Sequence, residues 1–103
     1  MVGEPVDIEI LSFIWDYRPG GNVDHLARHD VTTEDVVAVR AGKPLFFHNL
    51  PGRAASHVMI GRDGRGRSLY VALLAAADTG VWIPITGWQS ALAHGLLEED
   101  GQI

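Results

Sequence analysis

The chain of 103 residues contains no cysteine, which excludes disulfides and thiolate metal sites. A reducing cytoplasm is therefore the compartment that we expect. The sequence also lacks any apolar run of the roughly 18 residues that span a bilayer, and it does not begin with the basic and apolar blocks of a secretory signal. We expect a cytoplasmic protein with no membrane partner.

Basic residues are scarce too, with 8 Lys and Arg against 13 Asp and Glu and a formal net charge of −5. Nucleic-acid binders draw much of their affinity from neutralising phosphates, so this charge disfavours a free-standing nucleic-acid binder. Half of the basic residues nevertheless lie close together in the sequence: Arg53, Arg62, Arg65 and Arg67. We therefore expect a local basic patch on an acidic protein.

The remaining composition, 47% hydrophobic and 20% charged, is typical of a folded domain. A chain this short buries one core, so a single domain over residues 1–103 is expected. Hydrophobic periodicity and turn signals divide it into eight elements. The expected strands are 6–15, 44–49, 57–62, 68–75 and 81–85, and the expected helices are 22–29, 33–41 and 87–97.

This order, β-α-α-β-β-β-β-α, predicts an α+β fold. Consecutive strands joined by tight turns pair antiparallel, so we expect an antiparallel sheet of four to five strands. Two N-terminal helices and one C-terminal helix are expected to cover one of its faces. Pro84 predicts an edge position or a bulge in the last strand, and Thr32 or Thr33 followed by two acids predicts the N-cap of the second helix.

Four short motifs occur in a distinctive order along the chain. They are FIWD at 13–16, N-x-x-H-x-x-x-H with D-V-T-x-E at 22–34, an arginine with I-G-R and G-R-S-L-Y-V at 53–71, and IPITGW at 83–88. Together they cover about residues 13 to 97 and resemble the BrnT-type toxins, which belong to the RelE/ParE-like ribonuclease toxins of bacterial toxin–antitoxin pairs.

The resemblance implies a RelE-type fold and a metal-independent endoribonuclease that acts on mRNA and is neutralised by a cognate antitoxin. RNA and an antitoxin protein would be the partners, and a homodimer stays open. The chain departs from the family near its end, where Trp88 replaces an arginine and the last helix loses its basic residues. The alternative is a non-catalytic protein-interaction module of the same fold.

Candidate site residues follow from this chemistry. His57 and His48 are the expected proton-transfer groups, because an imidazole titrates near neutrality. Arg62 would stabilise developing charge and, with Arg53 and Arg67, bind phosphate. The odd spacing of His57 and Arg62 places them on opposite faces of one strand. In the alternative interpretation, these arginines form a solvated face or pair with acids such as Asp63, and the histidines are structural. Arg65, in the hairpin loop, is expected to be solvated.

Aromatic residues and helix histidines add further candidates. Trp88 and His94, at and after the start of the last helix, are expected to contact a partner protein, whereas Trp82 and Trp15 are expected in the core. His25 and His29 have the i, i+4 spacing of a metal-binding helix, but the neighbouring sequence offers no third ligand. His48 or His57 could supply one from the sheet, although nothing in the sequence places them there. We therefore expect no metal and no cofactor, with His29 closing its helix.

Overall fold

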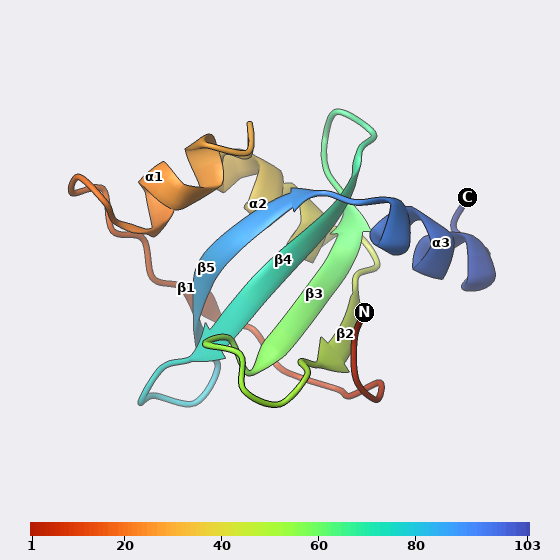
Figure 1. Ribbon diagram of the computed structural model, residues 1–103, viewed down its shortest axis with the longest axis horizontal. Helices are drawn as coiled ribbons and strands as arrows, with labels where there is room; N and C mark the ends of the chain where they lie inside the picture. The colour runs from red at the N-terminus through yellow and green to blue at the C-terminus, as the bar shows by residue number, and fades with distance from the viewer.

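The computed structural model covers residues 1–103 and places a five-stranded sheet, in the order β1-β5-β4-β3-β2, at the centre of the molecule (Figure 1). The strands are β1 (Ser12–Phe13), β2 (Leu45–His48), β3 (His57–Arg62), β4 (Ser68–Ala75) and β5 (Val81–Gln89). The helices are α1 (Asn22–Ala27), α2 (Thr33–Ala41) and α3 (Ala91–Glu99). The predicted α+β fold and element order are confirmed.

The sheet is mixed, and the prediction of an antiparallel sheet is wrong for β1. This strand pairs parallel with β5, with Ser12 opposite Val81, while the other neighbours pair antiparallel. Turn signals did not reveal this because β1 and β5 are far apart in the sequence, and no turn sets their direction.

The single strand predicted for residues 6–15 is divided between the two edges of the sheet. Near the N-terminus, Pro5 forms a bridge opposite Phe47 of β2, and the Val6 N–H donates to the Phe46 carbonyl at 3.0 Å. The chain then crosses beneath the sheet, where Ile10 is buried, and reaches β5 at the opposite edge (Figure 1). The N-terminal segment thus protects β2, which would otherwise be an exposed edge.

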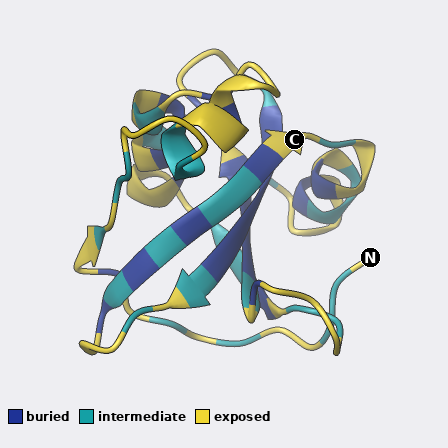
Figure 2. Ribbon diagram, turned by 60° about the vertical axis from the view of Figure 1, so that its left-hand side comes forward, coloured by how far each residue is buried: buried dark blue, intermediate teal, exposed yellow.

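Helices cover both faces of the sheet, which corrects the expectation of one covered face. One core cluster lies between the sheet and α1 and α2, and includes Leu26, Val36 and Val39. A second lies on the other face, where Ala93 and Leu97 of α3 are buried. Both faces of β4 contribute to these clusters, so the strand is buried from Ser68 to Leu73 without alternation (Figure 2).

Strand β5 is longer than predicted and contains the expected irregularity. Ala72 pairs with Thr86 and Leu73 with Pro84, so Ile85 is an extra residue in β5. This bulge confirms the prediction made from Pro84. The strand continues to Gln89, and α3 begins after Ser90, whose Oγ accepts the Ala93 N–H at 3.1 Å.

Asn22 connects the start of α1 to the free edge of β5. Its Oδ1 accepts the Asp16 N–H at 2.7 Å, and its Nδ2 donates to the carbonyls of Ile14 and Pro84, both at 2.9 Å. β1 pairs only with the beginning of β5, so the Asn22 side chain supplies the hydrogen bond to the Pro84 carbonyl that a longer neighbouring strand would supply. The asparagine of the N-x-x-H motif is thus a structural residue.

Two glycines let the helices approach the sheet closely. A Cβ atom on Gly61 would lie 2.9 Å from Val39 Cγ1, and one on Gly87 would lie 3.3 Å from Leu26 Cδ2. Both positions are buried beneath α1 and α2. Gly61, part of the I-G-R motif, therefore serves helix packing.

We predict that Gly61→Ala lowers the free energy of unfolding by about 1–3 kcal/mol, because the added methyl group overpacks this contact. Combining it with Val39→Ala is expected to cost less than the sum of the two single changes, since the second change opens space for the first. Urea denaturation measures both. Gly64→Ala, where the nearest atom is 4.0 Å away, is the control. Equal losses for Gly61→Ala and Gly64→Ala would contradict the packing role.

Candidate functional site

The residues proposed for one site lie on two faces of the sheet. The His57 ring contacts Trp82 in the core on the α1 and α2 side, with ring centres 4.9 Å apart. Trp88 instead stacks on Tyr70, on the opposite face. Arg62 ends β3 five residues after His57 and, by alternation, points to the face of Tyr70. This agrees with the prediction, made from their odd spacing, that His57 and Arg62 lie on opposite faces of one strand.

Arg67 and Arg65 are engaged in an ion-pair network rather than free. Arg67 donates to Asp63 at 2.7 Å and to Asp35 at 3.1 Å, and Arg65 donates to Asp35 at 2.8 Å. The Asp63 side chain has no exposed surface and also accepts the backbone N–H groups of Arg65 and Arg67. The network attaches the β3–β4 hairpin to the start of α2. The expectation that Arg65 is only solvated is wrong, because residues 30 to 35 lie against the hairpin.

Asp35 links this network to the cap of α2. Thr32 Oγ1 accepts the Asp35 N–H at 3.1 Å, and the Asp35 carboxylate accepts the Thr32 N–H at 2.9 Å, which is the expected capping box. Burial raises the pKa of Asp35, but the hydrogen bonds from Thr32 and Arg65 outweigh it and hold the pKa below its usual value. Asp35 is therefore a charged structural anchor.

His48 and His57 form a cross-strand pair at one end of the sheet. They are direct partners in the β2–β3 register, and their ring centres are 5.1 Å apart. Ser56 Oγ lies 2.8 Å from His57 Nδ1, which orients that ring. Burial, and secondly the charge of His48, lower the pKa of His57, so its imidazole is neutral at neutral pH. The two predicted proton-transfer residues do come together, but away from Arg62 and Arg67.

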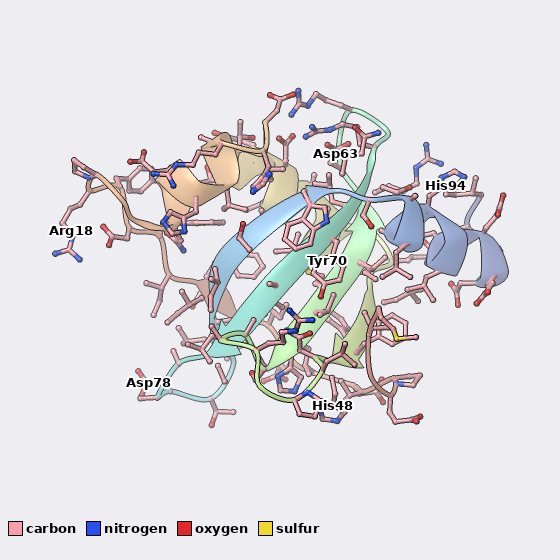
Figure 3. The ribbon with its side chains drawn as sticks, viewed as in Figure 1. Arg18, His48, Asp63, Tyr70, Asp78 and His94 are labelled. Atoms are coloured by element: carbon pink, nitrogen blue, oxygen red, sulfur yellow. The ribbon has the colours of Figure 1, made fainter.

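The opposite face carries an open groove of about 490 Å³. Its floor contains Tyr70 and Trp88, whose rings stack with centres 4.7 Å apart and planes 16° from parallel. Arg53 reaches the groove from the loop between β2 and β3, and Thr86 and Ser90 add hydroxyl groups. Figure 3 shows Tyr70 over the middle of this face. Burial raises the pKa of Tyr70, and the charge of Arg53 opposes the shift.

Tyr70 was missed at the sequence level. Its strand is apolar on both sides, and only the pairing of Tyr70 with Trp88 across β4 and β5 reveals an aromatic pair. Trp88 keeps 36% of its surface exposed in spite of this stacking. The groove therefore combines a flat, accessible indole with one cation.

His94 extends the groove along α3. A second hollow of about 410 Å³ contains His94, Ser68 and Ser90, and Ser90 also lines the first groove. His94 Nδ1 lies 3.4 Å from Ser68 Oγ, and His94 Nε2 lies 3.9 Å from the Glu98 carboxylate. Four of the predicted residues, Arg53, Arg62, Trp88 and His94, thus lie on the same face.

The histidines of the N-x-x-H-x-x-x-H motif do not form a pair on one helix. α1 ends at Ala27 rather than at His29, and the His29 ring lies beside Trp88, with centres 5.9 Å apart. No group of three or more His, Asp and Glu side chains is arranged to hold a metal ion. The expectation that His29 closes this helix is wrong, because α1 ends at Ala27 and His29 follows its C-cap, Arg28.

We predict that Arg67→Ala lowers the free energy of unfolding by about 2–5 kcal/mol, because it removes the closest cation from the buried Asp63 carboxylate and leaves only Arg65, at 4.0 Å. Arg62→Ala removes an exposed side chain that bonds only to the Gly66 carbonyl, so it is expected to cost less than about 1 kcal/mol. Thermal and urea denaturation of the two variants test this. Equal stability of the two variants would return Arg67 to the set of free, phosphate-binding candidates.

We also predict that the free energy of unfolding decreases as the pH falls through the ordinary histidine pKa of 6.5. The pKa of His57 is lower in the folded state, so the unfolded chain takes up the proton first and gains stability at low pH. Urea denaturation from about pH 5 to 8 should show a shallower dependence for His57→Gln than for wild type. Identical slopes for wild type and His57→Gln would contradict the assignment.

The described helices include none that is long and apolar enough to cross a membrane. Comparison with known proteins finds no matching family model, no matching curated protein and no matching solved structure.

Proposed function

We propose that this protein is the toxin component of a bacterial toxin–antitoxin pair, with a RelE-type fold, and that it binds single-stranded RNA in the groove and cleaves it without a metal. The observation that carries the proposal is the exposed Trp88, stacked on Tyr70 beside Arg53, on the sheet face that α3 only partly covers. The motif resemblance and the matching element order support it.

The groove offers the contacts that single-stranded RNA requires. A base stacked on an exposed aromatic ring gains about 1–3 kcal/mol, irrespective of its sequence. Arg53 is exposed and has no carboxylate partner, so its guanidinium is available for a backbone phosphate. Thr86 and Ser90 provide hydroxyl groups for base edges and the ribose hydroxyl.

Cleavage in this groove assigns the proton transfer to His94 rather than to His57 and His48, which lie behind the sheet. In metal-free cleavage, the ribose 2′-oxygen attacks phosphorus while a base takes its proton. The bond to the 5′-oxygen breaks, and an acid protonates that leaving group, which yields a 2′,3′-cyclic phosphate and a 5′-hydroxyl. His94 lies in the hollow that adjoins the groove at Ser90 and would carry the proton from the 2′-oxygen to the leaving 5′-oxygen, while Arg53 would stabilise the phosphorane charge.

The second candidate is the non-catalytic interaction module. It is favoured by the ion-pair network, which occupies Arg65 and Arg67 and leaves few free cations for a polyanion. Trp88 and Leu92 are 36% and 37% exposed beside the groove. They would bind apolar side chains of a protein segment, with an acidic residue of that segment on Arg53.

We predict that Trp88→Ala weakens binding of a labelled single-stranded RNA about tenfold or more, by removal of the stacking surface. Arg53→Ala should weaken binding and reduce the slope of log affinity against log salt by about one unit. Fluorescence anisotropy at several salt concentrations measures both. Arg18→Ala, which removes an exposed arginine already paired with Asp16, is the matched control.

Induced expression in a bacterial host tests the cleavage step. Wild type and His57→Ala are expected to arrest growth and produce RNA with 2′,3′-cyclic phosphate ends, whereas His94→Ala should do neither while still binding RNA. A wild-type protein that binds no RNA at low salt and does not arrest growth would exclude the toxin function and leave the interaction module.

A further inference from the structure

We propose that His48 and His57 together bind a divalent transition-metal ion, of the class of Zn²⁺ or Ni²⁺, on the sheet face away from the RNA groove. This site does not depend on the proposed function. It departs from the sequence expectation of no metal, which was based on the helix pair His25 and His29.

The geometry of the pair suits a shared metal ion. Two imidazoles bound to a tetrahedral zinc at Zn–N distances of about 2.0–2.1 Å have ring centres roughly 5 Å apart. The centres of His48 and His57 are 5.1 Å apart, with planes inclined by 41°, so the rings meet at an angle rather than stacked face to face. Because the two residues are paired directly in the β2–β3 register, the backbone already sets their separation.

A hydrogen-bonding partner fixes the orientation of the His57 ring, as is usual for histidines that bind metal ions. Its Nδ1 lies 2.8 Å from Ser56 Oγ, which leaves Nε2 available. Its ring stands edge-on to Trp82, and the Trp82 indole donates to the Glu9 carbonyl at 2.8 Å. His57 is half-buried, whereas His48 is exposed and leaves the site open to solvent.

Two protein ligands make a weak and open site. No third His, Asp or Glu side chain joins the pair, so water completes the coordination. Nitrogen ligands of this kind favour Ni²⁺, Cu²⁺ and Zn²⁺ over Mg²⁺ and Ca²⁺. The chain's net charge of −5 adds a general attraction for cations.

His25 of α1 and His29 just beyond it, called here the α1 histidines, provide a matched comparison within the same chain. Their i, i+4 spacing is the one associated with metal-binding helices, but His29 lies beyond the helix end and contacts Trp88. His48 and His57 are nine residues apart in the sequence, and only the strand register brings them together. We therefore expect metal binding at His48 and His57 but not at His25 and His29, although each site has two histidines.

Isothermal titration of chelator-treated protein with NiCl₂ and with ZnCl₂, near neutral pH, tests the site. Wild type is expected to bind one ion per chain, and His48→Ala to weaken the affinity roughly tenfold or more. His48 is exposed, so this variant should fold normally, which its thermal melting curve checks. The double variant His25→Ala and His29→Ala should bind as wild type does.

Trp82 gives a second readout, because its ring lies against His57. Ni²⁺ is expected to quench tryptophan fluorescence in wild type and in the α1 double variant, but not in His48→Ala or His57→Ala. Absence of binding to wild type, or loss of binding in the α1 double variant alone, would overturn the proposal. Equal binding by wild type and His48→Ala would overturn it as well.

Discussion

Burial of β3 and β4 on both faces is the constraint on which the rest of the structure depends. Leu69, Val71 and Leu73 of β4 pack against α1 and α2, whereas Tyr70 and Ala72 pack on the other side. A sheet buried in this way separates two surfaces, and no side chain of β3 reaches both. The histidine pair and the aromatic groove are consequently independent sites, and one ribonuclease centre cannot contain both.

The length of α3 determines where the groove lies. The helix begins after Ser90 and leaves the sheet, so Ala93 and Leu97 cover one end of the face only. Beyond that end, the stacked rings of Tyr70 and Trp88 cover the sheet in place of a helix. An aromatic pair fills this role because it shields the strands beneath while 36% of the Trp88 surface stays exposed to a ligand.

Features set by neighbouring residues were predictable from the sequence, and features set by distant ones were not. The capping box at Thr32 and Asp35, the β3–β4 hairpin and the bulge near Pro84 each depend on a few adjacent residues. The parallel pairing of β1, the face that each helix covers and the engagement of Arg67 by Asp35 depend on contacts across the chain. The sequence therefore identified the candidate arginines, but it did not predict which of them are engaged in ion pairs with acidic side chains.

The position of charge matters more for the groove than the net charge of −5 does. No Asp or Glu lines the groove around Arg53, whereas three acids gather against Arg65 and Arg67 behind the hairpin. Solvent and salt screen charges beyond roughly 8–10 Å, so distant acids repel a phosphate at Arg53 only weakly. An acidic chain can therefore present a groove that accepts an anion. Because a single arginine supplies the attraction, stacking on Trp88 must provide most of the affinity, and binding should depend less on salt than it does for strongly basic proteins.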